Sequence, residues 1–166
     1  VLRFLERRVH PTHAEDIASE VFLVAWRRLA DIPAEPDDAR AWLFGVARLT
    51  LLSGRRGELR QQAVAVRIAQ NQLGQGEGML DPELVARRLD VERAWSRLSA
   101  THQEALALSV WDGLDAPRAA RVLGISPVAY RLRLHRARQA LRALTDSLPR
   151  EASDALPAAE TSRSTS

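Results

Sequence analysis

Apolar side chains recur along this chain every three or four residues, the spacing that places them on one face of an α-helix. In the stretch Thr12–Ala30, Ile17, Val21 and Val24 fall on one strip and Phe22 lies beside it. No stretch shows the alternation of apolar and polar residues that is typical of a strand. The pattern therefore predicts an all-α fold, with helical stretches at residues 1–9, 12–30, 40–60, 82–98, 100–111, 115–124 and 126–144.

The first half of the chain contains two long predicted helices. Thr12 followed by Glu15 has the spacing of a capping box and predicts the start of the first helix. The second, "RAWLFGVARLTLLSGRRGELR", has Trp42, Val46 and Leu49 along its apolar face. Because Trp42 lies on that face, we expect it to anchor the core of this half.

The apolar face of residues 12–30 is broad, and the stretch before it is short. Residues 1–9 have a helical period but no capping residue, so the chain is expected to begin inside a helix and to lack a preceding one. Part of the broad face is then left uncovered. We expect Phe22, Val24 or Trp26 to be exposed as a result.

The helical pattern weakens between Gln61 and Glu83, where glycine stands at positions 74, 76 and 78. This composition predicts a flexible linker. After Leu144 the chain is rich in Ser, Ala, Pro and Thr without a period, and we expect it to be disordered. The predicted organisation is two small helical domains joined by a flexible linker, with boundaries at residues 1–60, 61–82, 83–144 and 145–166.

The end of the second domain has the capping and turn residues of a helix-turn-helix. Asp115 is placed to cap a short helix, Gly124 ends that helix, and Ser126 with Pro127 begins the next. A short helix, a glycine turn and a longer helix form the motif in which the second helix enters the major groove of DNA.

The last predicted helix separates its apolar and basic residues into two stripes. The apolar stripe, expected to face the core, consists of Tyr130, Leu134, Ala137, Leu141 and Leu144. The basic stripe consists of Arg131, His135, Arg138 and Arg142, with Arg136 on the other flank. No acidic residue lies between Ser126 and Leu144, although a solvated helix face normally mixes both signs. The partner of this helix is therefore expected to be negatively charged, and nucleic acid is favoured.

Composition narrows the functional classes. All 24 basic residues are arginine and the net charge is only +3, so the position of an arginine says more than the number of arginines. There is no cysteine, which excludes disulfides and thiolate metal sites. No signal peptide or bilayer-spanning stretch is present, so we expect a cytoplasmic protein without membrane insertion.

Nothing in the sequence indicates catalysis. The GxSxG, HExxH and phosphate-loop motifs are absent, and His10 with His13 lacks a third ligand nearby. We expect no enzyme activity, no catalytic or metal-binding residues and no cofactor.

Two motifs in order resemble a known family. "LSATHQEALALSVWDGLDAPRAARVLGISPVAYRLRLHRARQAL" is similar to the promoter-reading C-terminal domain of sigma-70 family factors of the extracytoplasmic-function (ECF) group. Further upstream, "AEDIASEVFLVAWRRL" resembles the helix that docks on the RNA polymerase clamp. "ARAWLFGVAR" followed by "GRR" resembles the segment that melts the promoter and reads the upstream edge of the transcription bubble. The resemblance covers about residues 1–144.

This resemblance implies an alternative sigma factor that binds core RNA polymerase and directs promoter recognition and transcription initiation, with an anti-sigma factor as a candidate further partner. The positions it implies for polymerase docking are Asp16, Ile17, Glu20 and Leu23. Those implied to contact the minus-ten region are Arg48, Arg55, Arg56 and Arg60. Those implied to contact the minus-thirty-five element are Ser126, Arg131, Leu132, His135, Arg136 and Arg138.

The chain also departs from the family pattern. Leu49 stands where members usually carry Asn, and Pro117, Arg118 and Ala119 stand where they usually carry an acidic and a β-branched residue. Leu132 replaces a small polar residue in the last helix, so the target sequence does not transfer. Two alternatives stay open: a helix-turn-helix transcriptional regulator, and a truncated sigma-like protein that binds polymerase without initiating.

Overall fold

The structure is a computed structural model that describes residues 1–54, 66 and 82–147. Within this part of the chain the elements are α1 (Leu2–Glu6), α2 (Pro11–Arg27), a 3₁₀ turn η1 (Leu29–Asp31), α3 (Pro36–Gly54), α4 (Pro82–Arg97), α5 (Ala100–Val110), α6 (Ala116–Leu123) and α7 (Pro127–Asp146). No strand occurs among the described residues. The all-α prediction is confirmed.

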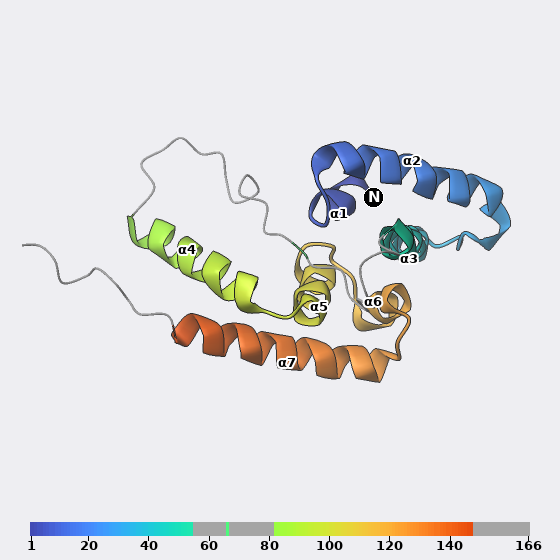
Figure 1. The fold of residues 1–166 in the computed structure, drawn as a ribbon. Coiled ribbons are helices and arrows are strands. Elements are labelled where there is room, and N and C mark those ends of the chain that lie inside the picture. The colour runs from blue at the N-terminus through green and yellow to red at the C-terminus, as the bar shows by residue number, and fades with distance from the viewer. Residues whose placement is uncertain (55–65, 67–81, 148–166) are drawn as a thin grey trace, which may run out of the picture.

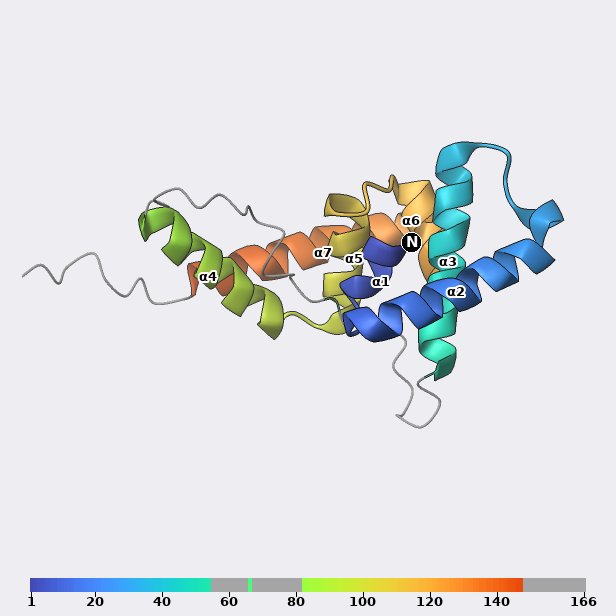
Figure 2. The same cartoon turned by 90° about the horizontal axis from the view of Figure 1, so that it is seen from above.

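The helices are stacked in layers (Figure 1). α1 and α2 lie at one side and pack on α3, and α3 packs in turn on α6. α5 and α6 form the next layer with α7 beneath them, and α4 lies along the second half of α7. Seen from above, α2 crosses α3 rather than running alongside it (Figure 2). α3 therefore packs on helices from both halves of the chain.

The predicted turn between α6 and α7 is confirmed. The Asp115 side chain accepts a hydrogen bond from the backbone N–H of Arg118, and the Ser126 side chain accepts one from the N–H of Ala129. Gly124 ends α6 with φ +67°, a left-handed conformation that favours glycine. At the other end of the chain the predicted capping box is wrong. α2 begins at Pro11 with His10 as N-cap and has no side-chain capping bond.

One hydrophobic core spans both halves of the chain. It includes Phe4 and Phe44, whose rings stack with centroids 4.6 Å apart. The buried members from the second half are Ala105, Leu108, Leu114, Ala119, Ala120, Val122, Leu123 and Tyr130. The two halves therefore share the apolar surface that stabilises them, and neither is packed as an isolated unit.

The buried face of α3 differs from the predicted one. Its buried residues are Ala41, Phe44, Ala47, Arg48 and Leu51. Leu49, predicted on the apolar face, is 65% exposed. Trp42, expected to anchor the core, is only half-buried and lies beneath the guanidinium of Arg28, which is 5.6 Å from the ring centroid. Because α3 packs on both α2 and α6, two neighbours set its rotation.

A second, smaller core holds Val66 against α4 and α5. Val66 is 1% exposed, and its N–H donates to Oε1 of Gln103 at 3.0 Å. The Val66 carbonyl accepts from the indole Nε1 of Trp95 at 2.6 Å. The Gln103 amide also donates to the backbone carbonyl of Trp95 at 2.9 Å. A point on the chain between the two halves is thus fixed to the second half.

Among the described helices, none is both long enough and apolar enough to cross a membrane.

Candidate DNA-binding and polymerase-docking surfaces

The inner face of α7 is the predicted one. Tyr130 and Ala137 are fully buried, and the remaining members of the apolar stripe are partly buried: Leu134, Leu141 and Leu144. The Tyr130 hydroxyl donates to the backbone carbonyl of Ala105 at 2.9 Å, and burial raises the pKa of Tyr130 to about 12. These contacts fix the rotation of α7 and so decide which residues face outward.

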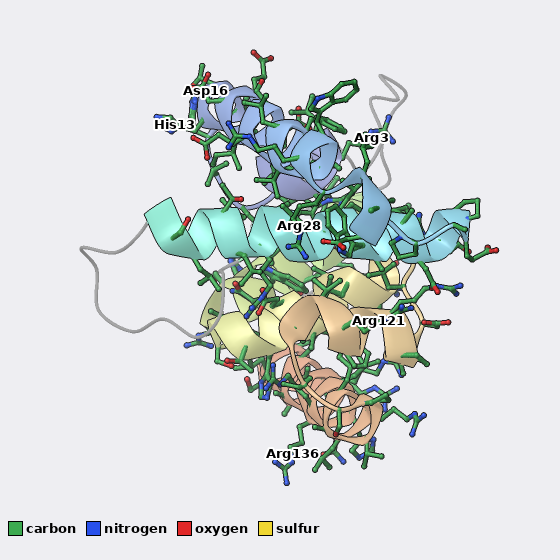
Figure 3. All side chains as sticks on the ribbon, turned by 90° about the vertical axis from the view of Figure 1, so that its right-hand side faces the viewer. Arg3, His13, Asp16, Arg28, Arg121 and Arg136 are labelled. Carbon is green, nitrogen blue, oxygen red and sulfur yellow. The ribbon has the colours of Figure 1, made fainter. Side chains whose placement is uncertain are left out.

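The outer face of α7 carries the predicted DNA-contacting residues. All six are exposed: Ser126, Arg131, Leu132, His135, Arg136 and Arg138. In Figure 3, Arg136 projects away from the body of the molecule. Within the described part of the chain, no ion pair involves an arginine of α7. This face therefore presents positive charge that no carboxylate neutralises, as a phosphate backbone requires.

A second surface lies on α2, on the other side of the molecule from Arg136 (Figure 3). Of the predicted polymerase-docking residues, Asp16, Glu20 and Leu23 are exposed, whereas Ile17 is partly buried against the core. The same helix and the turn after it expose three further large apolar side chains, Phe22 (54%), Trp26 (74%) and Leu29 (57%). An exposed apolar cluster of this kind marks a protein interaction site.

The exposure of Phe22 and Trp26 agrees with the sequence-based expectation, whereas Val24 is half-buried. The docking residues named from the sequence did not include Phe22, Trp26 or Leu29. Their common signal, large apolar side chains on the outer side of an amphipathic helix, is present in the sequence.

Arg48, predicted to contact phosphates near the minus-ten element, does not lie on the surface in this structure. Its side chain is 8% exposed, and that of its partner Glu104 is 1% exposed. Nε of Arg48 donates to Oε1 of Glu104 at 2.7 Å and Nη2 donates to Oε2 at 3.2 Å. This two-bonded pair joins α3 to α5. The DNA contact stays a prediction that requires Arg48 to leave Glu104.

Arg55, Arg56 and Arg60, the other predicted minus-ten contacts, lie outside the described residues, as do nearly all of the predicted linker and most of the predicted tail.

Two further buried ion pairs join the turn after α1 to the turn after α5. Asp112 accepts from Nη1 of Arg7 at 3.0 Å and from Nη2 of Arg8 at 3.4 Å. The Arg8 guanidinium also lies 3.5 Å from the ring centroid of Phe4. Burial lowers the pKa of Arg8 to about 10 and raises the pKa of Asp112, although the opposite charges counteract both shifts. Loss of hydration thus outweighs the attraction between these groups.

A third set of ion pairs joins the start of α3 to α6. Oδ1 of Asp38 accepts from Nε of Arg118 at 2.7 Å and from Nη2 of Arg121 at 2.6 Å. The hydrogen bonds from Arg121 and Arg118 lower the pKa of Asp38, and the bond to Asp38 raises the pKa of Arg118. Together with the pairs at Glu104 and Asp112, these contacts form a charged seam between the two halves.

No sequence-based inference identified this seam. Its partners lie between 56 and 105 residues apart in the chain, so no local spacing indicates them. One signal was available: Glu104 stands inside the apolar run "QEALAL". A carboxylate in a buried helix requires a basic partner.

No group of three or more potential metal ligands occurs among the described residues.

The comparisons with known proteins match both halves of the chain. A family model described as Sigma-70 region 2 matches residues 1–61, and one described as Sigma-70, region 4 matches residues 88–141. The ECF RNA polymerase sigma factor SigL of Mycobacterium tuberculosis is 34% identical over 131 residues, which cover 78% of this chain and 72% of SigL. The RNA polymerase sigma factor CnrH of Cupriavidus metallidurans is 32% identical over 145 residues, which cover 82% of this chain and 75% of CnrH.

A solved structure has a similar fold. It is the sigma factor RpoE from Bartonella quintana, in complex with the anti-sigma factor NepR. The match has a TM-score of 0.58 at 25% identity, and it covers 88% of this chain and 89% of the other.

Proposed function

This chain belongs to the sigma-70 family of RNA polymerase sigma factors, in its ECF group, and we propose that it docks core polymerase on α2 and reads the minus-thirty-five element with α7. As an alternative sigma factor it directs promoter recognition by RNA polymerase. The proposal divides that function between two surfaces of this chain.

The face of α7 is the observation that carries the proposal. Arg131, Arg136 and Arg138 are exposed, and no acidic residue lies between Ser126 and Leu144. Gly124 separates α6 from α7 in the order of a helix-turn-helix. In that motif, residues near the start of the second helix contact base edges in the major groove. We propose that Arg131, in the second turn of α7, and Arg136, in the third, contact guanine O6 and N7 or the neighbouring phosphates.

The outer face of α2 supports the docking half of the proposal. It combines two exposed carboxylates, Asp16 and Glu20, with the exposed apolar side chains of Phe22 and Trp26. Apolar anchors beside acidic groups suit a basic protein surface with an apolar centre. The α2 and α7 surfaces lie on opposite sides of the molecule, so one chain can contact polymerase and DNA at once (Figure 3).

Four further parts of the proposal follow. The protein acts in the cytoplasm, where polymerase and promoters are found. It has no catalytic residues of its own, and polymerase performs the chemistry. Arg48, Arg55, Arg56 and Arg60 contact the minus-ten region. An anti-sigma factor is a partner, as it is for the Bartonella protein in the solved complex.

The test is transcription with purified components. Core polymerase is incubated with the full chain and fragmented genomic DNA, and the transcripts are sequenced. We expect start sites that depend on the chain and share an upstream element. If the chain binds polymerase and no start site depends on it, the protein is a sigma-like factor that does not initiate.

The docking surface has its own test. Asp16→Arg with Glu20→Arg should lower co-purification with core polymerase at least about tenfold, because like charges then oppose each other at the interface. The control is Glu83→Arg with Asp90→Arg on α4, which reverses two other charges and should leave co-purification unchanged. Equal loss in both variants would contradict docking through α2.

A further inference from the structure

Two arginines of α6 converge on a single oxygen atom. Nε of Arg118 and Nη2 of Arg121 both donate to Oδ1 of Asp38, at 2.7 and 2.6 Å. Asp38 belongs to α3, in the other half of the chain, 80 and 83 residues away in sequence. Two guanidinium groups that share one anionic oxygen already have the arrangement that a phosphate oxygen needs.

The position of α6 in the motif gives this pair of arginines a role. α6 is the first helix of the helix-turn-helix, the helix that crosses the DNA backbone while the second lies in the groove. Arg118 lies in its first turn and Arg121 in its last, three residues later, so both side chains are on one face of the helix. The Asp115 carboxylate caps the helix and also accepts from Nη1 of Arg118 at 3.0 Å, so Arg118 keeps an acidic neighbour in its own helix when Asp38 leaves. In the sequence, Arg118 stands out only as a departure from the family pattern.

We propose that Arg118 and Arg121 form a phosphate contact for promoter DNA beyond those of α7, and that Asp38 occupies this contact in the closed arrangement seen here. The α3 carboxylate then competes with DNA for α6. A phosphate that binds both guanidinium groups must displace Asp38, because both groups are directed at its Oδ1.

The packing around Asp38 makes the competition intramolecular. α3 lies directly on α6, and a Cβ built at Gly45 of α3 would be 4.0 Å from the Cα of Val122 in α6. The carboxylate is therefore held at the site by the packing of the helix that carries it. DNA binding by α6 and separation of α3 from α6 become linked equilibria. This inference rests on the proposed reading of DNA by the second half.

The experiment measures binding of the full chain to a fluorescent 20-base-pair duplex of random sequence, by anisotropy over a range of salt concentrations. A random sequence isolates phosphate contacts from base contacts. Asp38→Asn is compared with Asp37→Asn, its neighbour. Among the ion pairs of the described residues, Asp37 has one partner, Arg40 of its own helix, at 3.6 Å. Replacing Asp37 by Asn changes the net charge by the same amount as replacing Asp38.

Asp38→Asn should tighten binding about three- to tenfold, because the competent state becomes more populated. Asp37→Asn should change it less than about twofold, because Asp37 acts on Arg118 only through space and its ion pair is with Arg40 of its own helix. In the background Arg118→Ala with Arg121→Ala, the difference between the two asparagine variants should disappear. The logarithmic salt slope should also fall by about one to two, since each lost phosphate contact removes about 0.9.

Each contrary result would overturn a specific part of this proposal. Equal binding by the Asp38 and Asp37 variants removes the competition. An Asp38→Asn effect that persists without the two arginines removes the phosphate contact. A chain that initiates transcription and shows either result loses this inference alone. If no variant binds the duplex at low salt, the proposed DNA reading fails as well.

Discussion

Arginines at the seam and arginines on α7 have opposite environments. Arg8 and Arg48 are buried and bonded to carboxylates from the other half of the chain. Arg131, Arg136 and Arg138 are exposed, and no ion pair of the described residues involves them. The residue type is the same in both places. What differs is whether folding brings an acidic partner to it.

This difference separates structural from functional arginines. A buried pair contributes little net stability when it is intact, but loss of one partner leaves an uncompensated charge in the interior. An exposed arginine contributes little to folding stability and is available to bind a ligand. The buried pairs of the seam, at Glu104 and Asp112, should therefore respond to mutation through stability, and α7 through DNA affinity.

Glu104→Gln should produce the largest effect. It leaves the Arg48 guanidinium buried beside a neutral amide and should lower the free energy of unfolding by about 3–5 kcal/mol. Urea unfolding measures this. Glu92→Gln, which breaks the partly exposed pair with Arg88 within α4, is the control and should cost less than about 1 kcal/mol. If both substitutions had equal small effects, Arg48 would not depend on Glu104 for its burial.

Substitutions on α7 should lower DNA affinity and leave stability nearly unchanged. Arg131→Ala and Arg136→Ala should each weaken binding to a minus-thirty-five duplex by about 1–3 kcal/mol if they reach base edges. Contacts to phosphate alone would lower affinity evenly across target and scrambled duplexes. The free energy of unfolding should change by less than about 0.5 kcal/mol in either variant. Parent-like binding to both duplexes would make the assignment of α7 as the recognition helix wrong.

Gly45→Ala should have the smallest effect and the opposite sign. A methyl group there would meet Val122 at 4.0 Å, an ordinary van der Waals contact. Alanine is favoured over glycine inside a helix by about 0.5–1 kcal/mol, so the variant should unfold at higher urea concentration. Gly54→Ala, at the end of α3 with no atom nearby, should change stability less. A destabilised Gly45→Ala would mean that α3 and α6 lie closer together than described.

The accuracy of each sequence-based prediction depended on how far apart in the chain the interacting residues lie. The turn at Gly124, the caps at Asp115 and Ser126 and the two stripes of α7 depend on residues within a few positions of one another, and all were predicted correctly. The exposed side of α2 was predicted in part, because amphipathicity identifies the outer side of the helix but not which of its apolar residues stay uncovered.

The predicted face of α3 failed for the opposite reason. α3 contacts α2 on one side and α6 on the other, so tertiary packing decides which residues are buried. Leu49 is exposed and Arg48 buried because Glu104 lies across the seam, 56 residues away. The sequence of α3 alone, which mixes apolar and polar residues, does not show which of its faces is buried.

The hydrogen bonds from Val66 to Gln103 and Trp95 also limit the length of chain that connects the two halves. Twelve peptide steps lead from Gly54 at the end of α3 to Val66, and an extended chain covers at most about 3.3–3.6 Å per step, hence about 40 Å. A minus-ten and a minus-thirty-five element are separated by about 25 base pairs, or roughly 85 Å along the duplex. With Val66 released, the twenty-eight steps from Gly54 to Pro82 span at most about 100 Å. The hydrogen bonds of one valine backbone thus set whether the tether between the two halves is short or long.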